Sequence, residues 1–323
     1  MFSRRLALAG LSSVALAPAL RAFPDRPLRL IVPFAPGGST DVAARFLAEA
    51  LGPLVGQSVI VENRAGANGA VASEAVIRSE ADGHVFLVAS ASTHGVNPAV
   101  ARRLDFDPIA DFAPVTMIGT TPLVLVASPA FGANRLDTLI ARLRSEPGKH
   151  SYASAGAGSI THLAGELFKL KAELNDVVHV PYRGGGPAMQ AVLTGEVAFT
   201  IESLASAASL IQGKRVVALA IGSPARQAVL PDVPTFAEAG LPGVELATWN
   251  MLLAPKATPP ERIDHVGRAV RAALASEALR ARLATAGTTA IADASSDQTG
   301  RYLAAQIEGF RAVAKAARIE LAD

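Results

Sequence analysis

Three glycine-containing turns are the features of this sequence with the clearest chemistry. Each follows an apolar run and precedes a helical pattern: Pro36-Gly37-Gly38-Ser39-Thr40, Gly156-Ala157-Gly158-Ser159 and Gly184-Gly185-Gly186-Pro187. A helix N-terminus carries unpaired N–H groups and about half a positive charge, and glycine lets a ligand come close to them. Any one turn is more simply explained as a structural connection. Three together favour anion binding without Lys or Arg, which suits a receptor that must release its ligand.

Nucleotide, metal and catalytic sites are not supported by the spacing of these residues. A dinucleotide motif starting at Gly156 would need glycine at position 161, where Thr161 stands, and no glycine cluster leads into Gly-Lys-Ser/Thr. The six histidines lack metal-ligand spacing. Ser159 near His162, or Ser39, leaves a secreted hydrolase as a weaker alternative, because no acid is visibly paired with His162. We therefore predict a protein that is not an enzyme and has no cofactor or metal.

Two further residues allow more than one interpretation. Glu202 ends the apolar run Val197–Ile201, so it can recognise a donor group on a ligand or cap the following helix. Trp249 is the only tryptophan, and it either packs at a hinge or forms a wall of a cleft, with packing favoured. His162 is interpreted as a helix-surface or packing residue.

The elements that must position these residues form two α/β units. Apolar runs at 28–33, 58–62 and 85–90 alternate with helical patterns, which predicts a parallel sheet with right-handed crossovers. A second unit with the same order spans 151–221, and the strand at 248–253 with the helices after it returns to the first. The predicted lobes are residues 23–123 with 247–323, and residues 124–246. Two crossings, near Leu123 and Thr248, predict a hinge and a cleft.

Composition limits the location and partners of the chain. It has 323 residues, 50% hydrophobic but only 5% aromatic, which suits α/β layers. Arg4, Arg5 and the apolar run 6–17 predict an export signal within residues 1–22, cleaved between about 17 and 22, and hence a periplasmic protein. Its removal leaves 27 basic against 28 acidic residues, since three arginines and no acid are lost. This balance argues against nucleic-acid binding, and the absence of cysteine excludes disulfides.

Beyond these features, nearly the whole of the expected mature chain resembles a known family. The matching stretches, in the family's order, are PLRLIVPFAPGGSTDVAARFLAEAL, VIVENRAGANGAVASEAV, ASTHGVNPAV, DFAPVTMIG, YASAGAGSITHLAGELF, HVPYRGGGPAMQAVLTGEV, LPDVPTFAEAGLPGVE and LLAPKATPP. They are similar to the Bug-type, or TctC-family, receptors of tripartite tricarboxylate transport systems. The resemblance implies a two-lobed type II periplasmic binding protein fold, also called a Venus flytrap, with two crossover segments.

The resemblance also implies a ligand and a set of site residues. The ligand is a small carboxylate, namely a mono- or dicarboxylate, an aromatic acid or an amino acid. The implied ligand-binding residues are Phe34, Ala35, Gly37, Gly38, Ser39, Ser92, Thr93, Gly156, Gly158, Ser159 and Thr161. Glu202 stands where this family often has Asp, so a relative's ligand does not transfer directly. The implied partners are membrane transporter subunits or, alternatively, a sensor kinase, and we expect a monomer.

Overall fold

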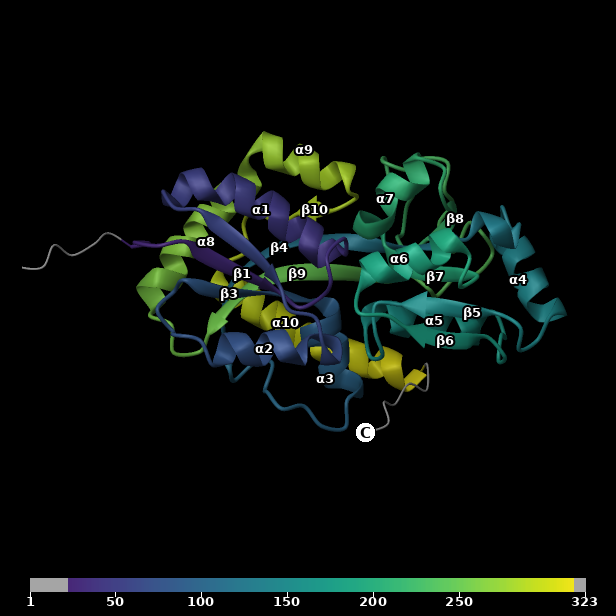
Figure 1. Ribbon diagram of the computed structural model, residues 1–323, viewed down its shortest axis with the longest axis horizontal. Coiled ribbons are helices and arrows are strands. Elements are labelled where there is room, and N and C mark those ends of the chain that lie inside the picture. Colours follow the sequence, from purple (N-terminus) through teal and green to yellow (C-terminus); the bar gives the residue numbers. More distant parts are fainter. Residues whose placement is uncertain (1–22, 317–323) are drawn as a thin grey trace, which may run out of the picture.

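A computed structural model describes residues 23–316 of the chain. The predicted export signal in residues 1–22 lies outside the described residues. The described strands form two half-sheets that lie side by side along the long axis and share one long strand (Figure 1). Within residues 23–316, no helix has both the length and the apolar character needed to cross a membrane.

The first half-sheet is built mainly from the N-terminal part of the chain. In spatial order it contains β2 (Val59–Asn63), β1 (Leu28–Val32), β3 (Val85–Ser90), β9 (Ala247–Pro255) and the first part of β4 (Phe112–Ala127), with β10 (Thr289–Ala290) also paired to β4. β1 pairs in parallel with β2 and β3, as the predicted strand–helix alternation requires. β9 is antiparallel to both its neighbours, which places a strand from late in the chain at the centre of this half.

Helices cover both faces of the first half-sheet (Figure 1). One face is covered by α1 (Ser39–Val55), α8 (Pro260–Ala275) and α9 (Glu277–Thr285). The other is covered by α2 (Ala70–Ile77), the π-helical turn η2 (Ala91–Val96), α3 (Asn97–Val100) and α10 (Ser296–Ala316). All six residues of β3 are buried, because a strand covered on both faces has no solvent side.

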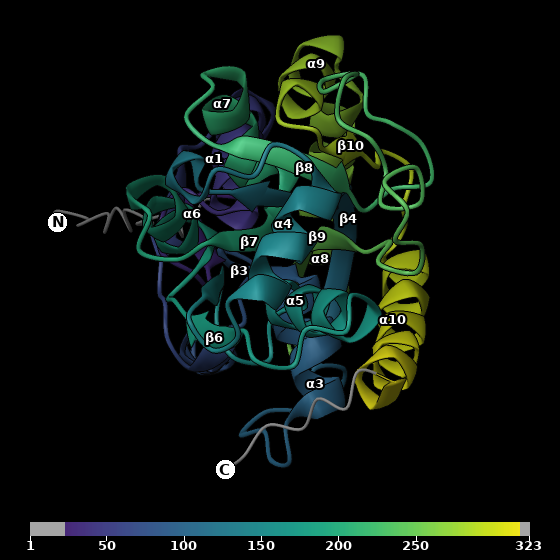
Figure 2. The ribbon, with the colours of Figure 1, turned by 90° about the vertical axis from the view of Figure 1, so that its right-hand side faces the viewer.

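The second half-sheet repeats this three-layer arrangement. In spatial order it contains β6 (Val178–Pro181), β5 (Ser151–Ser154), β7 (Phe199–Ser203), the end of β4 and β8 (Val217–Ile221). Its two faces are covered by α4 (Leu136–Ser145) with α5 (Ile160–Lys171), and by α6 (Gly185–Thr194) with α7 (Leu204–Gln212). Figure 2 views this half end-on, with α4 and α5 towards the reader.

Strand β4 joins the two half-sheets and is longer than the sequence predicts. Residues 112–122 pair with β9, and residues 123–127 pair with β7 and β8. The apolar run predicts a strand only over 123–127, because Pro114, Gly119 and Pro122 are typical of turns. Register shifts near Pro114 and Gly119 accommodate these residues, as β-bulges do for residues that cannot pair regularly.

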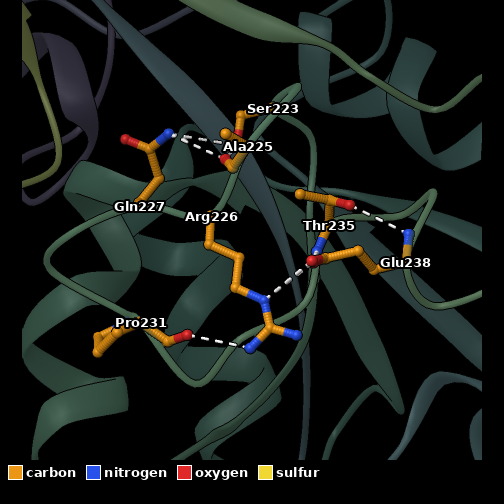
Figure 3. Close-up of polar contacts among 7 residues, drawn as sticks. All are labelled: Ser223, Ala225, Arg226, Gln227, Pro231, Thr235 and Glu238. Carbon is orange, nitrogen blue, oxygen red and sulfur yellow. Dashed lines mark hydrogen bonds and ion pairs between the residues drawn. The ribbon is translucent and has the colours of Figure 1, made fainter.

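The second crossing is the segment between β8 and β9. Its fold is fixed locally by Glu238, which accepts hydrogen bonds from Arg226 Nε at 3.0 Å and from the Thr235 amide at 2.8 Å (Figure 3). The segment ends beside β4, where the Leu123 amide donates to the carbonyl of Leu246 at 3.0 Å. The two crossings therefore run next to each other.

Candidate ligand-binding site

A small polar cavity lies between the two half-sheets. From the first half come Phe34, Gly38, Ser39, Thr40, Ser90, Ser92 and Thr248, and from the second Ala155, Ile160, Thr161, Gly185, Glu202 and Ser203. The volume that the centre of a water molecule can occupy is about 20 Å³, which is room for about one water. Apart from Phe34, Ile160 and Glu202, the walls are made of small or hydroxyl-bearing residues, so main-chain groups are close to the cavity.

Four helices begin at this cavity. The first residues of α1, α5 and α6 line it, and α7 starts immediately after the lining residue Ser203. Helices α1 and α6 have glycine N-caps, Gly38 and Gly184, and neither has a side-chain cap. Their first N–H groups therefore lack the usual partners, and their dipoles make this end of each helix electropositive. The cavity can accommodate negative charge although no Lys or Arg lines it.

The start of α5 is held by a connected set of hydroxyl groups. Ser159 caps the helix by accepting from the His162 amide at 3.1 Å, and Thr161 Oγ1 accepts from the Ala155 amide at 2.8 Å. The Ile160 amide donates to Ser92 Oγ at 3.1 Å. Because Ser92 belongs to the first half-sheet and Ile160 to the second, this bond links the two sides of the cavity.

The first and third glycine turns pack directly against each other. The Ala35 amide donates to the carbonyl of Arg183 at 3.1 Å. A Cβ atom built on Gly186 would lie 2.2 Å from the carbonyl oxygen of Pro36, and one built on Gly38 would lie 3.5 Å from the amide nitrogen of Gly185. The two halves approach this closely because glycine occupies both turns, so the structure is closed on this side of the cavity.

Two stacked histidines support the second glycine turn. The rings of His162 and His179 are 4.0 Å apart, and His162 Nδ1 accepts from the Gly158 amide at 3.2 Å. His179 Nε2 lies 2.7 Å from Ser154 Oγ. Burial lowers the pKa of both rings, that of His179 to about 4, so both are neutral at neutral pH. His162 is therefore a packing residue, as the sequence predicts.

Glu202 is the single Asp, Glu, Lys, Arg or His residue among those that line the cavity. Its side chain is 3% exposed, and Oε1 accepts from the amide of Ser203 at 2.8 Å. Oε2 has no hydrogen-bond partner among the described residues. Burial raises the pKa of this carboxyl to about 7, because the charged form loses its hydration. Ser203 caps α7 by accepting from the Ser206 amide. Of the two roles that the sequence leaves open for Glu202, the helix cap is therefore supplied by its neighbour.

The structure brings half of the sequence-predicted site residues onto the cavity wall. Those six are Phe34, Gly38, Ser39, Ser92, Thr161 and Glu202. The other six lie beside or behind it: Ala35, Gly37, Thr93, Gly156, Gly158 and Ser159. Thr93, for example, is fully buried and forms a capping box with Ser90. Gly156 instead lines a separate, wider groove between the halves.

The site residues predicted from the sequence do not include the remaining lining positions, although Thr40 and Gly185 belong to the glycine turns named there. The remaining positions are Thr40, Ser90, Ala155, Ile160, Gly185, Ser203 and Thr248. Several follow apolar strands immediately, where polar residues face the carboxyl edge of a sheet. Thr248 is a different case. Its only signal is that it is one of two polar residues, with Asn250, in the mostly apolar strand β9.

The other residues singled out from the sequence have structural roles. Trp249 is 1% exposed, and its Nε1 donates to Gln306 on α10 at 3.0 Å, so it packs in the first half and does not line the cavity. The Ser159 hydroxyl is fully buried and engaged as a helix cap, which does not suit a nucleophile. Within residues 23–316, no group of three His, Asp or Glu side chains is arranged to hold a metal.

Comparisons with known proteins agree with this geometry. Residues 43–319 match the tripartite tricarboxylate transporter family receptor, TctC. Protein BugT of Bordetella pertussis is 39% identical over 296 residues, which cover 91% of this chain and 90% of BugT. The fold is that of solved periplasmic binding proteins.

Two solved structures of similar proteins contain ligands. R. palustris Rpa4515 with adipate matches with a TM-score of 0.89 and 33% identity, over 92% of this chain and 99% of that one. MatC from Rhodopseudomonas palustris with bound malate matches with a TM-score of 0.85 and 31% identity, over 90% and 99%. Since the family match covers most of the chain, this protein belongs to the TctC family of tripartite tricarboxylate transporter receptors and is a periplasmic solute-binding protein, not an enzyme.

Proposed function

We propose that the chain captures a small carboxylate in the cavity between its half-sheets and presents it to a tripartite tricarboxylate-type transporter. The observation that carries this proposal is the meeting of four helix starts at a cavity that no Lys or Arg lines. Helix dipoles and main-chain N–H groups stabilise an anion there. Two similar proteins hold the dicarboxylates adipate and malate, which supports a carboxylate as the ligand. The proposed class is a mono- or dicarboxylate, an aromatic acid or an amino acid.

We assign the predicted site residues two roles within this proposal. Phe34, Gly38, Ser39, Ser92, Thr161 and Glu202 contact the ligand, together with the other lining residues. Ala35, Gly37, Thr93, Gly156, Gly158 and Ser159 hold the turns that carry those contacts. Because most ligand contacts then come from short side chains and main-chain amides, small rearrangements of the turns decide affinity.

Ligand entry requires the two halves to separate, because the cavity holds about one water. We propose that residues 23–123 with 247–323 move against residues 124–246, with the paired crossings at Leu123 and Leu246 as the hinge. Closure then removes the ligand from water and completes its contacts. The closed monomer, exported by the signal in residues 1–22, docks on membrane subunits of the transporter.

A thermal-shift screen of carboxylic acids on the purified mature protein tests the ligand class. A ligand that binds only the folded state raises the melting temperature, by an amount that grows with its concentration over Kd. Native mass spectrometry of the protein as purified would identify a ligand carried from the cell. No stabilisation by mono- or dicarboxylates, aromatic acids or amino acids would refute the proposal.

A pull-down of membrane proteins with and without the ligand separates the two docking partners. Recovery of transporter subunits supports the proposal, whereas recovery of a sensor kinase in their place supports a signalling role for the same closed form.

A further inference from the structure

The unpaired oxygen of Glu202 has a consequence for how a carboxylate enters the cavity. The side chain is 3% exposed, and it lines the space that four helix starts surround. Oε1 is already satisfied by the Ser203 amide, while Oε2 has no partner among the described residues. A buried polar atom left unpaired is costly, so a group that enters the cavity and pairs with Oε2 gains binding energy.

The surroundings of Glu202 supply no counter-charge. Its neighbours include Gly185 from α6, Ser203 at the end of β7 and Ser206 from α7. Its strand partner is Val124 on β4. The opposite walls contribute Ser39, Thr40, Ser90, Ser92 and Thr248. None of these side chains carries a charge at neutral pH.

Arg45 on α1, near the first glycine turn, does not supply a counter-charge either, because it pairs with the buried acid Asp41. Asp41 on α1 is engaged by Arg45 and Asn63, and it accepts from the Gly37 amide at 3.1 Å. The charge of Arg45 is therefore directed to Asp41, and Arg45 does not line the cavity.

An ionised Glu202 would face the negative ligand across this small space. Two carboxylates that share one poorly hydrated site cannot both ionise without strong repulsion. A neutral Glu202 removes that repulsion, and its Oε2–H becomes a donor to a ligand oxygen. The same atom that is unpaired in the closed structure then gains a partner.

We propose that Glu202 meets the bound carboxylate in its protonated form, so that ligand capture takes up one proton from solvent. This inference rests on the proposed carboxylate-binding function and adds its coupling to pH. Burial already raises the pKa of Glu202 to about 7, so the proton is exchanged within the neutral range. Above this range, capture requires protonation first, and affinity falls about tenfold for each further pH unit.

Calorimetric titration with adipate and with malate between pH 6 and 8.5 tests the coupling. For the wild-type protein we expect Kd to rise about 30-fold over this range. We also expect uptake of up to one proton per ligand near pH 8, measured by repeating the titration in phosphate and Tris buffers. The variant Glu202→Gln keeps the shape but cannot ionise, so its Kd should change less than about threefold. Glu261→Gln, at an exposed position on α8, is the matched control and should follow the wild type.

The pH dependence of the melting temperature without ligand tests whether Glu202 holds a proton in the folded protein. Between the usual pKa of a Glu, about 4.5, and the folded value of about 7, the folded state holds a proton that the unfolded state releases. The melting temperature of the wild type should therefore fall with rising pH relative to Glu202→Gln, and parallel profiles would overturn the proposal.

The outcomes with ligand separate this inference from the function on which it rests. Binding without proton uptake, or binding that tightens as pH rises, would overturn only the role of Glu202. The second result would mean that the ionised acid accepts from a donor on the ligand. If neither adipate nor malate binds, the titration is repeated with an acid that the thermal-shift screen finds. Absence of any such acid would overturn the carboxylate function, and this inference with it.

Discussion

The contact between the two glycine turns makes Gly186→Ala the most discriminating substitution in this protein. Gly186 is the second residue of α6, and its φ lies outside the left-handed region. Alanine there is compatible with the backbone, and it would favour the helix by up to about 1 kcal/mol relative to glycine. Any loss of ligand affinity must then come from what the new methyl group meets.

The new methyl group of Gly186→Ala would contact the first glycine turn, in the first half of the molecule. Its Cβ would lie 2.2 Å from the carbonyl oxygen of Pro36, about 1 Å closer than a real contact allows, so the turns must separate. Overpacking of this kind costs about 1 to 3 kcal/mol. If the closed form is the one that binds, this cost appears in the closing equilibrium, and Kd rises about 5- to 150-fold.

Calorimetry with adipate or malate measures the change in Kd, and small-angle X-ray scattering with ligand measures whether the halves still close. The control is Gly309→Ala on α10, where a Cβ meets nothing within 4 Å, and it should bind as the wild type does. If Gly186→Ala keeps both the affinity and the compact scattering profile of the wild type, the turn contact is not part of the ligand-bound state and our reasoning about closure is refuted.

Three other substitutions test separate contacts. Ser92→Ala removes the acceptor of the Ile160 amide across the cavity, so Kd should rise about fivefold, for the loss of about 1 kcal/mol; unchanged affinity would mean that this bond is absent from the bound form. Trp249→Phe removes the hydrogen bond to Gln306 and should lower the free energy of unfolding in urea by about 2 kcal/mol, with no effect expected on Kd if the residue only packs. His179 has its pKa lowered to about 4 by burial, so the unfolded state binds a proton that the folded state does not. The free energy of unfolding of the wild type should therefore fall relative to that of His179→Gln as pH drops from about 6.5 to about 4. If the difference between their urea midpoints stays constant across that range, the ring is not neutral in the folded state.

The alternation of strands and helices could be predicted closely because each element carries its own local signal. The runs at 85–90 and 151–154 coincide with β3 and β5, and the expected crossings near Leu123 and Thr248 fall on β4 and β9. The first part of β4 was not predicted, because Pro114, Gly119 and Pro122 break the local pattern and only pairing with β9 keeps the strand extended.

The site was harder to predict because it depends on contacts between distant residues. Helix-start chemistry pointed to turns that lie at or beside the cavity. It could not show that Gly184–Gly186 packs on the first turn, since that contact joins two halves of the molecule. The seven missed lining residues include Thr248 and Ser203, whose approach to the cavity depends on how β9 and β7 are placed. Only the assembled sheets determine this.

The position of β9 has a consequence for the order in which the molecule folds. Ser90 on β3 pairs with Asn250 on β9, so the first half must wait for a strand synthesised far later. By contrast, β5 to β8 all lie within residues 151–221, and they need only β4 from earlier in the chain. Closing a long loop is slow. The second half should therefore gain its hydrogen-exchange protection first during refolding, with the N-terminal strands protected last although they are made first.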